Sequence, residues 1–148
     1  PLLFYLINYI SLIKDMHFML QNEVVNRIVA MPGNKDFGRL SVMLQYHFQT
    51  EKLFLVKPGA FFPPPKVESA IVRLTPRAEI LNPVLDQKTF SSLVSTCFSQ
   101  RRKTLRNNLK GILSEEDIVD IGIDPGCRAE TLETKDFVTL ANAAFQNR

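Results

Sequence analysis

The spacing of apolar side chains predicts a mixture of helices and strands over the first half of the chain and helices alone over the second half. Apolar residues recur every three or four positions in the helical stretches, whereas short apolar runs bounded by turn residues indicate strands. The predicted helices cover 1–13, 22–30, 39–48, 87–100, 101–113, 114–122 and 134–146, and the predicted strands cover 16–21, 52–58 and 66–76.

Residues that start and stop helices sharpen several of these boundaries. Asn22 is expected to cap the second helix, with Glu23 in its first turn, where a negative charge is favourable. A segment that holds proline and glycine, 31–38, ends that helix. Ser114 followed by Asp117 approximates a capping box. The strand at 16–21 is expected to be buried, because its apolar run is short and nearly continuous.

A change of composition near residue 84 predicts two structural parts. Residues 77–86 have the character of a linker and include Pro83. Strands are expected only before this linker, and only helical patterns follow it. We therefore expect an α/β part at residues 1–84 and a small all-α part at residues 85–148.

The composition fits a folded protein with an uneven charge distribution. Of the 148 residues, 45% are apolar, which is enough to bury a core, and the formal net charge is +3. Residues 101–110 hold five basic residues and no acid, whereas residues 115–136 hold eight acids against Arg128 and Lys135. This separation of charge, more than the net value, favours an anionic partner for one surface.

The basic block "QRRKTLRNNLK" is the first candidate binding feature. On a continuous helix, Arg102 and Arg106 would lie on one flank with Lys103 and Lys110, and Arg101 would lie at its edge. Like charges at this spacing repel, and a polyanion would relieve the repulsion, so phosphate contact is one interpretation. A solvated helix face balanced by the later acids is the other, and charge alone does not separate them.

The stretch "GAFFPPPKVESAIVRL", residues 59–74, is the second candidate feature. Proline fixes φ and lowers the entropy of a loop, so Phe61 and Phe62 are held with little freedom. A ring held in this way beside a pocket can stack on a nucleobase. Without further information, burial of both rings in the core is the favoured interpretation. A helix-turn-helix DNA-binding protein would explain the basic block but not this stretch.

Several other kinds of chemistry find no support in the sequence. Cys97 and Cys127 form no CxxC pair and no disulfide framework, and reduced thiols in a cytosolic protein are expected. His17 and His47 lack the spacing of metal ligands, so no metal site is expected. The sequence holds no Gly-rich phosphate loop. The apolar start is too short for a membrane span and lacks the features of a signal peptide, so no membrane partner is expected.

Five ordered segments carry a resemblance to a known family. The chain closely resembles the bacterial KsgA-type dimethyladenosine transferases of small-subunit ribosomal RNA, and the resemblance runs through essentially its whole length. The segments are "DMHFMLQNEVVNRIVA", "GRLSVMLQYHF", "PGAFFPPPKVESAIVRL", "FSQRRKTLRNNL" and "GIDPGCRAETL". Five segments in this order are more specific than any single motif.

The resemblance implies a fold, a reaction and a partner. The fold is an α/β Rossmann-like methyltransferase domain, represented here by its last strands and helices, followed by a small all-α C-terminal domain. The reaction is transfer of methyl groups from S-adenosylmethionine to N6 of two adjacent adenosines near the 3′ end of 16S ribosomal RNA. The enzymes act in the cytoplasm, late in the assembly of the small ribosomal subunit.

The resemblance also implies roles for particular residues. Phe61 is implied to stack on the flipped target adenine. Phe62 stands where the family often has a polar residue, and we expect it to turn the other way and pack into the core, with loop structure until about Val67. The residues expected to bind RNA are Arg101, Arg102, Lys103, Arg106, Arg128 and Lys66.

One departure from the family is large. Its S-adenosylmethionine loop, its acidic cofactor contacts and its NLPY motif all precede the residue that matches Pro1. We therefore expect this chain to be the back portion of the enzyme, without a cofactor site, inactive alone and able to self-associate through an exposed sheet edge.

Two alternative functions remain open. One is a non-catalytic RNA-binding or ribosome-assembly module. The other is a related large-subunit ribosomal RNA adenine methyltransferase that gives antibiotic resistance. The RRK segment, residues 101–103, and "GIDPGCRAE", residues 122–130, favour the small-subunit type.

Overall fold

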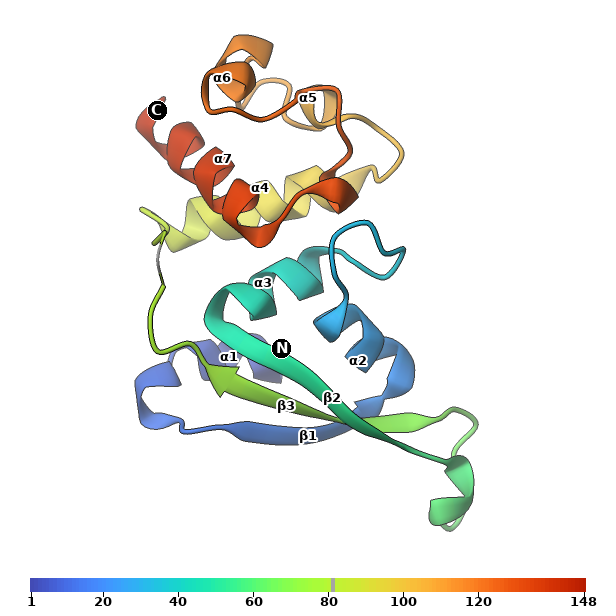
Figure 1. Ribbon diagram of the computed structural model, residues 1–148. Helices are drawn as coiled ribbons and strands as arrows, with labels where there is room; N and C mark the ends of the chain where they lie inside the picture. Colours follow the sequence, from blue (N-terminus) through green and yellow to red (C-terminus); the bar gives the residue numbers. More distant parts are fainter. Residues whose placement is uncertain (81) are drawn as a thin grey trace.

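A three-stranded sheet forms the base of the molecule in the computed structural model, which describes residues 1–80 and 82–148 (Figure 1). The strands are β1 (Met16–Gln21), β2 (Phe48–Val56) and β3 (Ser69–Pro76), in the order β1-β3-β2. β3 is antiparallel to both neighbours, with Leu74 opposite Met16 and Pro76 opposite Phe48. The two outer strands therefore run parallel to each other.

Helices α2 (Asn22–Val29) and α3 (Arg39–His47) cover one face of this sheet (Figure 1). Every second residue of β3 points toward them, as the two-residue period of a strand requires. The buried cluster between sheet and helices consists of Val25, Ile28, Leu44, Phe48, Ala70, Val72 and Leu74. The prediction that β1 is a buried strand is wrong, because its alternate residues His17, Met19 and Gln21 are exposed.

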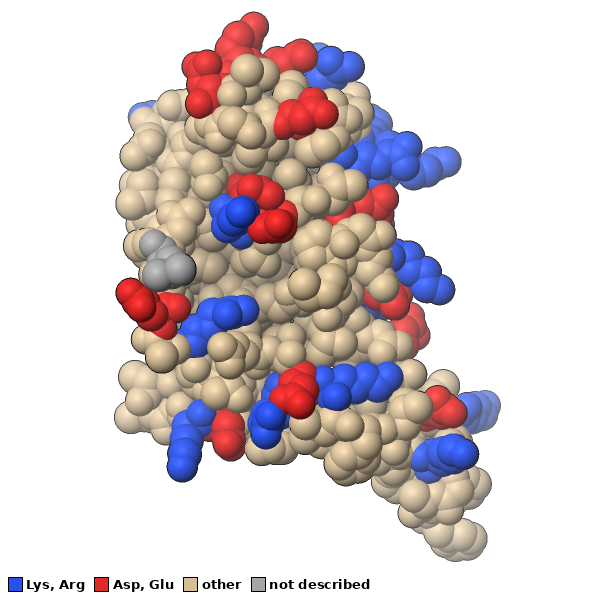
Figure 2. All heavy atoms as spheres, in the orientation of Figure 1, with Lys and Arg blue, Asp and Glu red and all other residues tan. Residues whose placement is uncertain are grey.

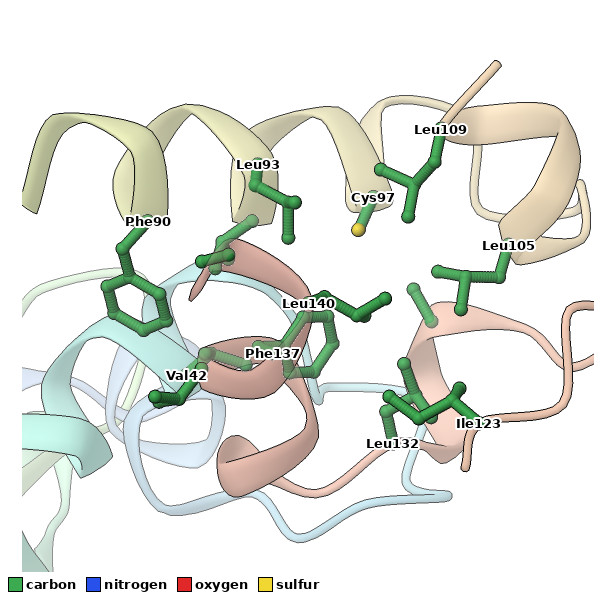
Figure 3. Close-up of a cluster of buried hydrophobic side chains, with 14 of the residues drawn as sticks. Val42, Phe90, Leu93, Cys97, Leu105, Leu109, Ile123, Leu132, Phe137 and Leu140 are labelled. Atoms are coloured by element: carbon green, nitrogen blue, oxygen red, sulfur yellow. The ribbon is translucent and has the colours of Figure 1, made fainter. Parts of the chain in front are cut away.

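A second and larger core lies among the helices on the far side of α3 (Figure 3). It is built by α4 (Gln87–Ser99), α5 (Leu105–Asn108), α6 (Glu115–Asp120), the short helix η3 (Ala129–Thr131) and α7 (Thr134–Gln146). Aromatic rings join these elements, since Phe98 contacts Phe37 and stacks on Phe137 at 5.4 Å between centroids.

Helix α3 is shared by the two cores. Its Leu44 belongs to the cluster on the sheet, whereas Val42, Met43 and Tyr46 belong to the helical cluster. The division of the chain at residue 84 stays a prediction, and the larger cluster includes residues from both sides of it. Among the described residues, no helix combines the length and the apolar character needed to cross a bilayer.

Helix starts follow local capping chemistry. The Asp86 carboxylate accepts hydrogen bonds from the Thr89 N–H at 2.8 Å and the Thr89 hydroxyl at 2.7 Å, which lowers the pKa of Asp86. The capping box at α6 is confirmed, since Ser114 and Asp117 each accept the other's backbone N–H. Asn22 is not a cap: it is the first helical residue of α2, after an extended Gln21.

Two further predictions concern the helix at 1–13 and the linker at 77–86. The helix expected at 1–13 breaks after α1 (Leu2–Ile7) and continues only as the short helix η1 (Ile10–Leu12). Residues 77–80 and 82–86 form no helix or strand, as expected for the linker, whose Leu81 lies outside the described residues. The Val84 N–H donates to the Tyr46 hydroxyl at 3.0 Å, so the end of the linker is fixed to α3.

Candidate nucleic-acid interface

An arm, defined here as residues 54–67, extends beyond the helical layers at one end of the sheet (Figure 1). It comprises the end of β2, the short helix η2 (Pro58–Ala60), the proline run and the residues before β3. The Phe61 N–H donates to the Pro58 carbonyl at 3.2 Å, which fixes the backbone just before the prolines. The three prolines lack N–H groups, and the segment stays a loop until β3 begins at Ser69, two residues after the predicted end of the loop near Val67.

The two phenylalanines of the arm differ in exposure. Phe61 is partly buried, which agrees with the expectation of a partly exposed ring. Phe62 is fully exposed, at 101% of its reference area, so the prediction that it packs into the core is wrong. That prediction assumed an extended segment with a core on one side, whereas the arm extends past the core and offers Phe62 no packing surface.

The basic block adopts a turn where a continuous helix was expected. Residues 101–103 connect α4 to α5, and α5 covers only Leu105–Asn108, so the prediction of one helix at 101–113 is wrong. Thr104 is extended, and the Asn108 side chain donates to the carbonyls of Cys97 at 3.0 Å and Gln100 at 3.2 Å at the end of α4. These bonds stabilise the reversal of the chain.

Arg101 is anchored to the protein. Its guanidinium donates to the carbonyls of Lys35 and Phe37, each at 2.9 Å, and lies 3.4 Å from a carboxylate oxygen of Glu130. Those carbonyls belong to the loop between α2 and α3, so Arg101 ties the basic turn to the sheet-covering helices. Its role in RNA binding stays a prediction.

Arg102 and Lys103 have a different setting. Both are exposed, and among residues 1–80 and 82–148 neither has a hydrogen-bonding or ion-pairing side-chain partner. Their charges are therefore directed at solvent. Two adjacent cations of this kind can contact phosphates without first breaking an internal ion pair.

The other predicted RNA-binding residues are exposed but dispersed. Arg106 on α5 pairs with Glu115 at 3.2 Å. Arg128 precedes η3, and the adjoining backbone is held against α5 because the Leu105 N–H donates to the Cys127 carbonyl at 2.8 Å. Lys66 lies on the arm, directly after the prolines. The structure thus places Arg128 near the basic turn and Lys66 beside the aromatic pair.

Basic side chains gather along the edge of the molecule that carries the arm. Figure 2 shows Lys and Arg side chains at several places along this edge, from the helical part down to the arm, with acidic side chains between them. The basic turn and the arm lie on this same edge in Figure 1. A strand of nucleic acid could contact both without passing around the molecule.

Two further features were not found from the sequence. Lys57, exposed on the arm, was overlooked, although a basic residue close to paired aromatics is a usable signal. A groove between α1, α3 and α4 holds Arg39 and Lys88, and the Arg39 guanidinium lies 5.1 Å from the centre of the Phe4 ring. No sequence motif marks this groove, because its residues come from three separate elements.

The shifted pKa values of the buried histidine and the two cysteines indicate a structural role and not a catalytic one. Burial lowers the pKa of His47 to about 4, so the imidazole is neutral near pH 7. Burial raises the pKa of the Cys97 thiol to about 12 and, with smaller effects from neighbouring groups, also raises the pKa of Cys127. Both thiols are therefore protonated and poor nucleophiles near neutral pH.

The junction between β1 and α2 differs from the cofactor-binding turn of Rossmann-like folds. Rossmann-like folds bind their cofactors at a Gly-rich turn between a strand and a helix. Here β1 passes directly into α2 at Gln21 and Asn22, with no glycine, and α3 follows a loop. No group of His, Cys, Asp and Glu suited to a metal ion occurs in the described part of the chain.

Solved structures with similar architecture define the class of protein. A dimethyladenosine transferase from Plasmodium falciparum superposes with a TM-score of 0.83 at 25% identity, over 95% of this chain and 60% of that one. The 23S rRNA methyltransferase ErmE superposes with a TM-score of 0.58 at 25% identity, over 90% of this chain and 55% of that one. The chain therefore shares the methyltransferase fold of these proteins. Its small sheet and flanking helices correspond to one part of that fold.

Sequence relatives define the family. The profile of the family "Ribosomal RNA adenine dimethylase" matches residues 1–146, and the chain belongs to this family. Ribosomal RNA small subunit methyltransferase A of Laribacter hongkongensis is 56% identical over 96% of this chain and 54% of its own length. The protein of the same name from Pseudomonas aeruginosa is 57% identical over 96% of this chain and 53% of its own length. The resemblance noted from the sequence is confirmed, and the chain spans about half the length of these curated relatives.

Proposed function

We propose that this chain supplies the RNA-binding half of a ribosomal RNA adenine N6,N6-dimethyltransferase. The substrate in this proposal is a pair of adjacent adenosines near the 3′ end of 16S ribosomal RNA within the small ribosomal subunit. The reaction takes place in the cytoplasm. S-adenosylmethionine supplies the methyl groups of the reaction when bound, and the described residues act on the RNA.

The observation that carries the proposal is the position on one edge of two different features whose chemistry suits RNA. The arm presents a partly buried ring, Phe61, on a loop stiffened by prolines, and the basic turn presents Arg102 and Lys103 to solvent. Stacking of a base on an aromatic ring is worth about 1–3 kcal/mol. That energy offsets much of the few kcal/mol needed to unstack a base from RNA. The cations of the basic turn bind phosphates of the same RNA further along this edge, away from the unstacked base.

The small-subunit substrate is favoured over the large-subunit one by two comparisons. The relatives that share more than half of their aligned residues with this chain are named for the small subunit. The superposition on a dimethyladenosine transferase is closer than that on ErmE, with TM-scores of 0.83 and 0.58. ErmE acts on 23S rRNA, as its name says.

A non-catalytic RNA-binding role of the chain by itself is the second candidate. It is favoured by the absence of a Gly-rich strand-to-helix turn in the described residues. In that case β1, whose outer edge has no partner among the described strands, would pair with another chain.

A chimera tests the proposed function directly. The matching half of the Pseudomonas aeruginosa relative is replaced by this chain, and transfer of labelled methyl groups to unmethylated small subunits is measured. We expect transfer to small subunits, none to large subunits, and a rate about 5- to 150-fold lower with Phe61→Ala, from the loss of about 1–3 kcal/mol of stacking.

The same assay separates the alternatives. Transfer to large subunits in place of small ones would support the resistance-type enzyme. A chimera that binds small subunits but transfers no methyl groups would support the non-catalytic role. Thermal melts of the Phe61→Ala chimera serve as the control for folding.

A further inference from the structure

Phe62 is the most exposed large apolar side chain described in the molecule. Its ring is 101% exposed, and the arm around it also exposes Phe54 at 58%, Val67 at 50% and Leu55 at 46%. A phenylalanine ring in water loses the burial that stabilises such a side chain in a core. Several exposed apolar side chains on one short segment indicate a place where a partner binds.

The charge around Phe62 indicates the chemistry of that partner. The arm holds two exposed lysines, Lys57 and Lys66, and no acidic residue. Lysine is depleted at protein–protein interfaces, whereas rings combined with cations are typical of surfaces that bind single-stranded nucleic acid. The combination on the arm therefore favours an unpaired stretch of RNA over a protein partner.

The prolines after Phe62 fit the same role. Pro63, Pro64 and Pro65 fix φ, so the backbone beside the ring loses little entropy when a ligand binds. The ring carries no hydrogen-bonding group, so it would accept any base by its flat face. A contact of this kind positions the RNA without reading its sequence.

We infer that Phe62 is a second stacking platform, which holds an unpaired base adjacent to the base that Phe61 takes. This inference rests on the proposed function, because it assigns Phe61 to the target adenine. Two neighbouring bases of the RNA would then no longer stack on each other, because one would stack on Phe61 and the other on Phe62. Phe62 is a positioning residue in this arrangement and contacts no reacting atom.

Fluorescent RNA tests the inference on the whole 148-residue chain. The probe is a short oligouridine with two adjacent central adenosines, either of which is replaced by 2-aminopurine, whose emission reports on stacking. The variants are Phe62→Leu, Phe62→Trp and Phe61→Leu. Phe145→Leu is the matched control, because that ring is also exposed but lies on α7, away from the arm.

The expected pattern distinguishes the two rings. Phe62→Leu should weaken RNA binding about 5- to 150-fold, the change that corresponds to the loss of one stacked base, and should abolish the signal at only one of the two labelled positions. Phe61→Leu should abolish the signal at the other position. Phe62→Trp should retain affinity, and Phe145→Leu should change neither affinity nor signal.

Other outcomes overturn the inference, and they are separable from failure of the proposed function. If Phe62→Leu binds as the unaltered chain does while Phe61→Leu is weakened, the second platform does not exist and the proposed function stands. If the unaltered chain gives no stacking signal, the inference fails, and methyl transfer by the chimera still decides the proposed function. If Phe62→Leu converts a dimer to a monomer in sedimentation without affecting RNA binding, the ring contacts a second copy.

Discussion

The helical core and the arm use the same side chain in opposite ways. In the core, Phe90 and Phe137 are fully buried, and Phe137 stacks on Phe98 at an angle of 29° between the ring planes. On the arm, Phe54 and Phe62 are exposed. Core rings are held in place by their neighbours, whereas the rings beside the prolines are held by the backbone. An aromatic residue that needs no neighbour for its orientation is free to take a ligand.

The same contrast holds for polar residues of the two regions. Arg101 is held by two carbonyls and a carboxylate, whereas Arg102 and Lys103, next to it in sequence, have no such partners among the described residues. Within one basic triplet, the first residue fixes the turn and the other two are available to phosphates. Four predictions test how far this division extends.

The largest effect is expected from Phe137→Ala. Removal of a fully buried ring leaves a cavity and should lower the free energy of unfolding by about 3–5 kcal/mol, measured by urea denaturation. The paired variant Phe62→Ala should change it by less than about 0.5 kcal/mol, because the ring contacts solvent. Equal losses in the two variants would abolish the distinction between core and arm.

A smaller effect is expected from the buried histidine. The pKa of His47 is lowered from 6.5 to about 4, so the unfolded chain binds a proton more readily than the folded one between these values. Above about pH 6.5 this group does not change the free energy of unfolding with pH. As the pH falls from about 6.5 to about 4, protonation of His47 in the unfolded chain lowers the free energy of unfolding, and below about pH 4 the effect is constant. The total loss is no more than about 3 kcal/mol.

Two variants isolate this dependence from that of the carboxylates. His47→Gln should flatten the stability profile between about pH 4 and pH 6.5, measured by denaturation at a series of pH values. Gln49→Ala, an exposed residue of β2 that does not titrate, should leave the profile as it was. An unchanged profile with His47→Gln would show that the buried ring does not titrate in this range.

The third prediction, a smaller loss of stability than either of those above, concerns Arg101. Arg101→Ala removes the bonds to the Lys35 and Phe37 carbonyls and should lower the free energy of unfolding by about 1–2 kcal/mol, less than for fully buried charged bonds because the guanidinium is half-exposed. Arg102→Ala should be neutral within about 0.5 kcal/mol. Thermal melts compare the two, and equal stability of both variants would remove the anchoring role of Arg101.

The smallest effect on the fold, but a measurable one on RNA, is expected from the two free cations. Changing Arg102 and Lys103 to Gln should reduce the slope of log affinity against log salt by about 0.7–0.9 for each lost phosphate contact. Lys135→Gln is the control, because Lys135 already pairs with Glu133 at 3.3 Å. A slope that is the same in both variants would assign the basic turn to solvent alone.

Periodicity was sufficient to predict the regular elements that bury one face. The bounds of β1 and α7 match the predicted ranges 16–21 and 134–146, and α4 ends one residue before its predicted end. These segments have a repeated apolar pattern and clear breaks, so local sequence and burial agree. The contribution of β1 was still misjudged, because a pattern in one strand does not show whether its second face is covered.

The parts that were not predicted depend on contacts between distant residues. The reversal at Thr104 requires Asn108 to reach the end of α4, and the anchoring of Arg101 requires carbonyls more than 60 residues earlier in the chain. Phe62 was misplaced because alternation along an extended segment determines direction but not whether a core lies in that direction. Phe61 and residues 101–103 were recognised from their motifs, whereas their different surroundings could be seen only in three dimensions.

The position of β3 between β1 and β2 has a consequence for the order in which a newly made chain can fold. Neither outer strand has a partner in this sheet until β3 is made, and Pro76 follows Met16 by about 60 residues, or about 3–12 s at a synthesis rate of about 5–20 residues per second. During that interval neither outer strand can make the backbone hydrogen bonds that it shares with β3 in this sheet. A chain interrupted before residue 69 would lose the whole three-stranded sheet, because its last strand holds the other two together.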